Sequence, residues 1–199
     1  MQALLLNGAV AGDEGLQPID HVLRAALLTR GWTVSRVQLR DVVIAYCKGC
    51  FDCWVKTPGI CSTKDCALEV TRGLIRSDLV VLLSPVTFGG YSSEIKKALD
   101  RSIGMVSPFF VRIDGEVHHE ARYEKYPALL GVGVTSDHDL DERRTFATLV
   151  ARNAINFHAP AYLAGFVSRD DPSEKVELLM NDYAAQMTAG IRVVQRGAA

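Results

Sequence analysis

Residues 79–103 read LVVLLSPVTFGGYSSEIKKALDRSI, and they join a strand, a glycine-containing loop and a helix. Leu79 to Leu83 is an unbroken apolar run, which is typical of a strand buried on both faces of a parallel sheet. Ser84 to Gly90 follows as a loop, and Ser92 or Ser93 can cap the helix that begins there. This order predicts one strand–helix unit of an α/β fold.

Predicted strands and helices alternate along the whole chain, five of each when this unit is included. Right-handed crossovers between parallel strands then place helices on both faces of one sheet. The strands are expected at 2–7, 32–39, 79–83, 128–134 and 162–167, and the helices at 18–30, 65–76, 92–103, 140–157 and 173–193. The sequence predicts an α/β flavodoxin-like three-layer sandwich with a five-stranded parallel sheet, order 2-1-3-4-5, and a ligand site at the carboxyl ends of its strands.

A Rossmann dinucleotide fold is the structural rival. It would place Gly-x-Gly-x-x-Gly after the first strand, but residues 7–12 read NGAVAG, which does not have that spacing.

Length and charge exclude several classes of protein. The 199 residues suit a single domain over 1–199, with a cysteine-rich insert at 47–66 and a long loop at 104–126. A net charge of -1 without a basic run argues against nucleic acid or an anionic membrane as a partner. No apolar stretch is long enough to span a bilayer, and the N-terminus lacks the pattern of a signal peptide. We therefore expect a cytoplasmic protein.

Three loops at the carboxyl ends of the predicted strands favour a ligand site. They are residues 7–15, 84–93 and 133–139. Gly89, Gly90 and Gly133 reduce side-chain bulk there, so that a planar ring can approach the backbone. Glycines in one loop would only indicate a turn, but three such loops at one edge indicate a site.

Two segments resemble a known family. Ser84 to Ser93, with Lys96 and Asp100-Arg101 on the following helix, is similar to the flavin-ring loop of the NAD(P)H-dependent FMN reductase and iron-sulfur flavoprotein family. Cys47 to Trp54, with Pro58-Gly59-Ile60-Cys61, resembles the cysteine insert of the same family. The resemblance covers about the first two-thirds of the chain.

The resemblance implies an FMN cofactor, NAD(P)H as co-substrate and a homodimer or homotetramer. No catalytic side chain is expected, because hydride transfer through a flavin needs orientation and electrostatics from the protein rather than a nucleophile. The residues expected to bind the flavin are Asn7, Ala9, Gly15, Leu16, Pro85, Val86, Thr87, Phe88, Gly89, Gly90, Ser92, Thr135, Ser136 and His138.

The first loop departs from the family pattern. The family offers Ser, Arg and Thr to the FMN phosphate, but residues 7–15 carry neither a hydroxyl nor a basic side chain and contain Asp13 and Glu14. Two carboxylates would repel a phosphate dianion. Backbone N–H groups at a helix N-terminus can still hold the phosphate, so weak retention of FMN is expected.

All five cysteines lie between Cys47 and Cys66, which favours a metal or redox site over a disulfide scaffold. Cys47, Cys50, Cys53 and Cys61 have the C-x2-C-x2-C-x7-C spacing with which iron-sulfur flavoproteins bind a 4Fe-4S cluster. A four-cysteine zinc site is a second interpretation. In a third, the thiols are reduced and only pack a loop around Trp54. Cys66 falls at a helix start and is expected to stay outside the group.

The favoured hypothesis is an FMN-dependent NAD(P)H oxidoreductase with a small-molecule or protein electron acceptor. One alternative is an electron-transfer iron-sulfur flavoprotein that does not use nicotinamide directly. Another is a flavin-free binding domain, which the acidic first loop favours. Residues 104–126 are rich in aromatic side chains and are expected to help close the site of a neighbouring copy in a homo-oligomer. Asp100 and Arg101 are expected to form an ion pair.

Overall fold

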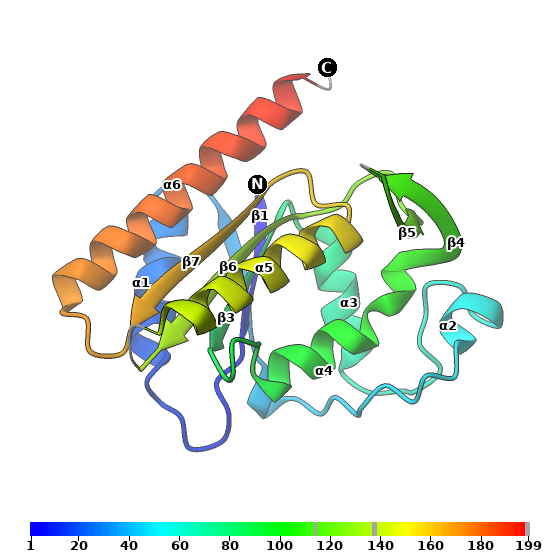
Figure 1. The fold of residues 1–199 in the computed structure, drawn as a ribbon, viewed down its shortest axis with the longest axis horizontal. Coiled ribbons are helices and arrows are strands. Elements are labelled where there is room, and N and C mark those ends of the chain that lie inside the picture. The colour runs from blue at the N-terminus through cyan, green and yellow to red at the C-terminus, as the bar shows by residue number, and fades with distance from the viewer. Residues whose placement is uncertain (114, 137–138, 198–199) are drawn as a thin grey trace.

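The computed structural model describes residues 1–113, 115–136 and 139–197. In this part of the chain, five parallel strands form one sheet in the order β2-β1-β3-β6-β7 (Figure 1). They are β1 (Gln2–Asn7), β2 (Thr33–Gln38), β3 (Leu79–Pro85), β6 (Ala128–Thr135) and β7 (Tyr162–Ser168). The predicted flavodoxin-like fold with a five-stranded parallel sheet is confirmed. The numbering of its last two strands differs from the prediction, because two further strands precede them in the chain.

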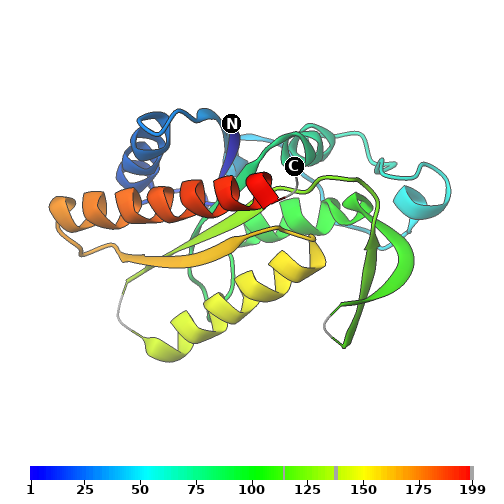
Figure 2. The same ribbon diagram turned by 90° about the horizontal axis from the view of Figure 1, so that it is seen from above.

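Helices cover both faces of this sheet (Figure 2). One face packs against α1 (Gln17–Leu28) and α6 (Ser173–Gly197), and the other against α3 (Ala67–Arg76), α4 (Ser93–Arg101) and α5 (Leu140–Asn156). Neighbouring side chains of β1 point to opposite faces, so Leu5 packs with the α1–α6 layer and Leu4 with the α3–α4–α5 layer.

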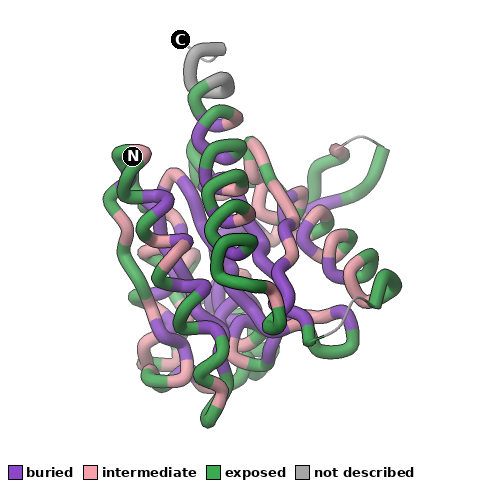
Figure 3. The backbone as a smooth tube through the Cα atoms, turned by 90° about the vertical axis from the view of Figure 1, so that its left-hand side faces the viewer, coloured by how far each residue is buried: buried purple, intermediate pink, exposed green. Residues whose placement is uncertain are grey.

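The central strands are buried along their whole length, whereas β2 at the edge of the sheet is not. All seven residues of β3 and all eight of β6 are buried, but only one residue of β2 is. Figure 3 shows the buried strands between helices whose outer sides are exposed. Burial on both faces explains the unbroken apolar run of β3 and the polar residues of β2.

Residues 104–126 are not the long loop that the sequence predicted. They contain an antiparallel hairpin of β4 (Val106–Ile113) and β5 (Glu116–Ala121). Arg122 Nε donates to the carbonyl of Gly104 at 2.8 Å, and the Tyr126 hydroxyl donates to the carbonyl of Met105 at 2.6 Å, which fastens the base of the hairpin. The sequence carries a hairpin signal that the prediction missed, the Asp-Gly pair at 114–115.

The cysteine segment lies against this hairpin. It contains the short helix α2 (Asp52–Val55), and Figures 1 and 2 show α2 at the same end of the molecule as β4 and β5. Trp54 Nε1 donates to the carbonyl of Val106 at 3.0 Å, and the Trp54 ring lies 4.7 Å from the ring of His119 on β5. Two short 3-10 turns, η1 (Leu39–Asp41) and η2 (Ile103–Met105), complete the described elements.

Within the described ranges, no helix is both long and apolar enough to cross a membrane.

Candidate functional site

The loops after β1 and β3 are packed tightly together at the carboxyl end of the sheet. The N–H of Gly8 donates to the carbonyl of Leu83 at 2.8 Å. A Cβ atom on Gly8 would lie 2.4 Å from Ile95 on α4, so glycine allows the first loop to lie this close to the first turn of that helix. Ser92 caps α4, and its own N–H donates to the Ser84 hydroxyl at 2.8 Å. These contacts hold the first turn of α4 beside the first loop.

Residues 87–90 form a tight turn that presents an aromatic ring to solvent. The N–H groups of Thr87 and Gly90 donate to each other's carbonyls at 3.1 and 2.8 Å. Phe88 and Gly89, the two central residues, have positive φ values of 49° and 73°. A left-handed backbone costs a non-glycine residue about 1–3 kcal/mol, yet the Phe88 side chain is 93% exposed and gains little from burial. A strained backbone with an exposed ring makes this turn a candidate for ligand binding.

The two glycines of this turn have different roles. A Cβ atom on Gly89 would lie 2.6 Å from Thr145 of α5, so Gly89 seats the turn on that helix. Around Gly90, by contrast, the nearest atom to such a Cβ is the carbonyl oxygen of Thr87 at 3.4 Å. Gly90 therefore borders open space, into which a planar ring can approach the backbone. Of the other residues predicted here, Pro85 is buried and Val86 is half-buried.

The third predicted loop follows β6. Thr135 is buried, and its hydroxyl accepts a hydrogen bond from Arg143 at 3.1 Å, whereas Ser136 is exposed. Asp139 caps α5 by accepting from the N–H groups of Asp141 and Glu142. His138, which was expected to contact the flavin, lies outside the described residues.

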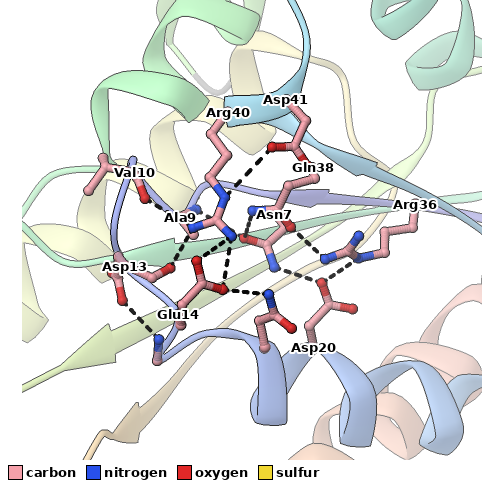
Figure 4. A network of polar contacts seen from close by, with 12 residues as sticks. Asn7, Ala9, Val10, Asp13, Glu14, Asp20, Arg36, Gln38, Arg40 and Asp41 are labelled. Carbon is pink, nitrogen blue, oxygen red and sulfur yellow. Dashed lines mark hydrogen bonds and ion pairs between the residues drawn. The ribbon is translucent and has the colours of Figure 1, made fainter.

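Asn7 shapes the first loop from inside. Its side chain is fully buried, and its Oδ1 accepts the N–H of Ala9 at 3.0 Å while its Nδ2 donates to Asp20 at 2.6 Å (Figure 4). Arg36 donates to the same Asp20 oxygen at 2.7 Å. Ala9 and Leu16 are also buried, so of the binding residues predicted in this loop only Gly15 is exposed.

The two acids of the first loop are paired with arginines. Arg40 donates to Glu14 at 2.9 Å, and Arg169 donates to both oxygens of Asp13 at 2.8 and 2.6 Å. The hydrogen bond from Arg169 lowers the pKa of Asp13, and the hydrogen bond from Arg40 lowers that of Glu14. The repulsion that the sequence predicted for an incoming phosphate is therefore largely compensated by two cations from outside the loop.

A second feature is a cavity of about 390 Å³ between the cysteine segment, the hairpin and the C-terminal ends of α4 and α5. We call it the cysteine cavity. Its wall includes the four cysteines predicted to act together, Cys47, Cys50, Cys53 and Cys61, whereas Cys66 does not line it. The rest of the wall combines apolar side chains with polar ones, the former including Phe51, Leu99, Ile103, Val106 and Phe157 and the latter Lys48, Asp100, Arg101, His119 and Asn153.

The four thiols lie near one another but do not form a ready metal site. Burial raises the pKa of the Cys53 thiol, and the nearby thiols of Cys61, Cys47 and Cys50 raise it further. Among the described residues, no three His, Cys, Asp or Glu side chains have an arrangement that could hold a metal ion. Cys47 and Cys50 are exposed, so the segment would have to draw them inward to ligate a metal.

Arg101 clamps both flanks of the cysteine segment. Its guanidinium donates to Asp65 at 2.7 and 3.0 Å, and to the carbonyls of Ala45 at 2.8 Å and Thr63 at 3.2 Å. Burial alone would raise the pKa of Asp65, but hydrogen bonds from Arg101 and two backbone N–H groups bring it below its usual value. The expected Asp100–Arg101 ion pair is wrong, because Asp100 accepts from Lys96 one helical turn earlier.

Sequence reasoning missed several residues at both sites. Arg40 is the second residue after β2 and Arg169 the first after β7, at the carboxyl edge of the sheet, and neither was predicted as a site residue. His119 of the cavity wall was passed over because its hairpin was not predicted; within the described residues its Nδ1 is buried and makes no hydrogen bond.

Comparison with known proteins bears on the family and the fold of the chain. The sequence model of a family described as NADPH-dependent FMN reductase matches residues 1–138. An iron-sulfur flavoprotein of Archaeoglobus fulgidus is 29% identical over 102 residues, which cover 51% of this chain and 49% of that protein. An iron-sulfur flavoprotein of Methanocaldococcus jannaschii is 34% identical over 77 residues, 39% of each chain. The chain thus spans half or less of the length of these curated relatives.

Two solved structures share the fold over most of their length. An NAD(P)H:quinone oxidoreductase from Methanothermobacter marburgensis superposes with a TM-score of 0.69 at 10% identity, covering 92% of this chain and 94% of that one. An FMN-dependent NADH-azoreductase from Bacillus anthracis, solved in complex with FMN, gives a TM-score of 0.63 at 11% identity and covers all of both chains. At such identities the likeness concerns the fold alone.

Proposed function

Because the chain belongs to the NADPH-dependent FMN reductase family, we propose that it is an FMN-dependent oxidoreductase that takes a hydride from NAD(P)H and passes the electrons to a small-molecule or protein acceptor. The observation that carries this proposal is the turn at 87–90, where an exposed Phe88 and the open face of Gly90 meet at the carboxyl edge of the sheet. This is where a doubly wound α/β fold binds its ligand.

The residues at this edge fit a flavin. Gly90 leaves its backbone open to a planar ring, and Phe88 offers an aromatic edge or face beside it. The N–H groups of Ala11, Gly12 and Glu14 donate no hydrogen bond within the described part of the chain. Such free donors just before α1 suit the phosphate at the other end of the cofactor.

FMN, when bound, supplies the chemistry of accepting a hydride and releasing its electrons. The contribution of this chain is to orient the ring and to limit its contact with water. Thr87 to Gly90 would contact one side of the ring. Thr135 ends the neighbouring strand and Ser136 follows it, since β3 and β6 pair directly. No side-chain proton transfer is required by this scheme.

The test is a visible spectrum of protein purified without oxygen, followed by addition of NADPH or NADH. We expect the purified protein to show flavin absorbance, and we expect this absorbance to bleach rapidly when the nicotinamide is added. Bleaching only by a separate reductase or ferredoxin would support an electron carrier, and the absence of flavin binding even with added FMN would support a binding domain.

The electron-carrier alternative rests on the cysteine cavity, where four thiols share one wall. In this alternative Cys47, Cys50, Cys53 and Cys61 hold a 4Fe-4S cluster, and a zinc ion or simple packing are the competing roles. Thiolate ligands suit both metals, so only metal analysis separates them.

If iron is bound, Cys50→Ala should remove it nearly completely, because a cluster that lacks one thiolate is labile. Cys66→Ala is the matched control and should leave the iron content unchanged, since Cys66 does not line the cavity. Metal analysis of anaerobically prepared variants decides the matter. Loss of iron from Cys66→Ala together with its retention in Cys61→Ala would identify Cys66 as the fourth ligand. A wild-type protein that contains neither iron nor zinc would mean that the cysteines only pack the loop.

We also propose that the hairpin forms a contact between copies of the chain and helps close a neighbour's site. Phe109 and Phe110 of β4 are 68% and 70% exposed, which is unusual for adjacent aromatic side chains unless they form an interface. Light scattering should give the mass of a dimer or tetramer for wild type, and a lower mass for a variant with both residues changed to serine. A monomeric wild type at working concentration would end this proposal.

A cytoplasmic location completes the proposal. All five cysteines are free in the structure, and a reducing compartment would keep them so. Recovery of the protein outside the cytoplasmic fraction of its cells would contradict it.

A further inference from the structure

Two arginines reach the first loop from the opposite edges of the sheet. Arg40 lies in η1, directly after β2, and Arg169 directly follows β7. β2 and β7 are the two edge strands, with β1 and its loop between them. The first loop therefore receives one guanidinium from each side, although its own residues contribute none.

Arg40 holds the backbone of the loop. Its Nη1 donates to the carbonyls of Val10 at 3.3 Å and Asp13 at 2.9 Å, and its Nη2 donates to Glu14 (Figure 4). In a trans peptide the carbonyl and the following N–H point in opposite directions. By binding these two carbonyls, Arg40 directs the N–H groups of Ala11 and Glu14 away from itself. Arg40 is thus a positioning residue for the loop.

Arg169 has a different set of contacts. Both of its terminal nitrogens donate to Asp13, and these are the only hydrogen bonds of its guanidinium within the described residues. Asp13 Oδ1 also accepts the N–H of Gly15 at 3.0 Å. A Cβ atom on Gly15 would lie 2.2 Å from Arg169 Nη1, so glycine is required for the guanidinium to lie there.

The Asp13 carboxylate is thus bound as an anion by a two-pronged guanidinium and a backbone N–H two residues before α1. A phosphate group prefers the same donors in the same place. The Asp13–Arg169 pair is neutral, and a phosphate dianion beside it would be repelled by the carboxylate and attracted by the guanidinium. The guanidinium of Arg169 cannot make both of its hydrogen bonds with Asp13 and with a phosphate at the same time. The phosphate must therefore compete with Asp13 for these hydrogen bonds.

We propose that Arg169 binds the phosphate of FMN and that Asp13 occupies Arg169 until the phosphate replaces it. This inference rests on the proposed function, since it concerns the same flavin site. Asp13 is ionised at neutral pH, because its hydrogen bond with Arg169 holds its pKa below the usual range, and it is therefore a permanent competitor. The replacement needs no oxidant or proton, only rotation of one side chain toward solvent.

Riboflavin has the same ring as FMN but lacks the phosphate. Comparing the affinities for riboflavin and FMN therefore distinguishes contacts with the phosphate from contacts with the ring. Dissociation constants for both compounds are measured by quenching of flavin fluorescence with the wild-type chain, Arg169→Gln and Asp13→Asn. Arg72→Gln is the matched control, since Arg72 forms an exposed ion pair with Glu69 on α3 and its loss changes the net charge equally.

Arg169→Gln should weaken FMN binding by about tenfold or more, the usual effect of losing a charge-assisted pair of hydrogen bonds. Riboflavin binding should change less than about twofold, because no phosphate contact is lost. Asp13→Asn should tighten FMN binding severalfold and leave riboflavin unchanged, since Arg169 then carries an uncompensated charge. Arg72→Gln should change neither constant, and Arg169→Lys should restore part of the preference for FMN.

Four results would overturn the inference. An unchanged ratio of FMN to riboflavin affinity in Arg169→Gln would mean that Arg169 does not contact the phosphate. Weaker FMN binding in Asp13→Asn would mean that the ion pair only supports the loop. Binding of neither flavin by wild type would remove the proposed function itself, whereas binding of riboflavin and FMN with equal affinity would leave that function standing and reject only the role of Arg169.

Discussion

Arg101→Leu should destabilise the folded chain by about 3–5 kcal/mol, which is the usual result of leaving one member of a buried ion pair alone. The side chains of Arg101 and Asp65 are only 1% and 7% exposed, so neither charge can turn to water without local unfolding. Arg101 also binds carbonyls of Ala45 and Thr63, on either side of the cysteines. Urea unfolding measures the free energy, and alkylation of Cys53 reports opening of the segment.

Lys96→Gln is the matched control, because Lys96 forms an exposed ion pair with Asp100 on the same helix. Its effect should stay below about 1 kcal/mol. Replacing both Arg101 and Asp65 by leucine should be less harmful than replacing Arg101 alone, since no unpaired charge remains. Equal free energies of unfolding for Arg101→Leu and Lys96→Gln would show that the contacts of Arg101 with Asp65 and the two carbonyls do not stabilise the fold.

The sign of the pH dependence follows from the pKa of Asp65, which lies below its usual value of 3.8 in the folded chain. Such a group stabilises the fold above pH 3.8, and this contribution is lost as the pH falls through the lower, folded value. The difference in the free energy of unfolding between wild type and Arg101→Leu should therefore become smaller in acid.

Gly90→Val should abolish flavin binding while the chain stays folded. The backbone of Gly90 has no positive φ, and an added Cβ would meet only the Thr87 carbonyl oxygen at 3.4 Å, so the unliganded fold can accept valine. The two methyl groups would instead fill the space that a flavin ring needs. We expect a loss of affinity of at least about a hundredfold, since the ring would have to leave its place against the backbone.

Flavin titration measures this loss, and near-ultraviolet circular dichroism with thermal unfolding checks the fold. Gly90→Ala should give an intermediate loss. Gly190→Ala, on α6, is the remote control, because its Cβ would have a single contact at 3.9 Å, with Ala161. A folded Gly90→Val protein that retains FMN as tightly as wild type would place the ring elsewhere.

The fold was predictable because its strands are of the type that sequence patterns reveal best. β3 and β6 are buried on both faces, so their apolar runs have no polar interruption. The hairpin was not predictable in the same way, since four of the eight residues of β4 are exposed, Phe109 and Phe110 among them. A strand without a buried face lacks the alternation on which such predictions depend.

At the candidate site, the sequence indicated the loops but not their partners. The glycine-containing loop after β3 could be recognised locally, because the backbone conformation of Gly89 depends on its neighbours in the chain. The pairing of Asp13 with Arg169 spans 156 positions, so nothing local to Asp13 reveals that its charge is compensated. Long-range ion pairs of this kind follow from the three-dimensional arrangement alone.

The contact between Trp54 and His119 has a consequence for protein engineering. One part of the wall of the cysteine cavity comes from the segment that follows β2, and another part from the hairpin that follows some fifty residues later in the chain, between α4 and β6. The cysteine segment therefore cannot be transferred to another protein by itself with its surroundings intact. A designer who grafted the cysteine loop alone onto another flavodoxin-like scaffold would lose its aromatic wall and its arginine clamp, and would have to transplant all three parts together.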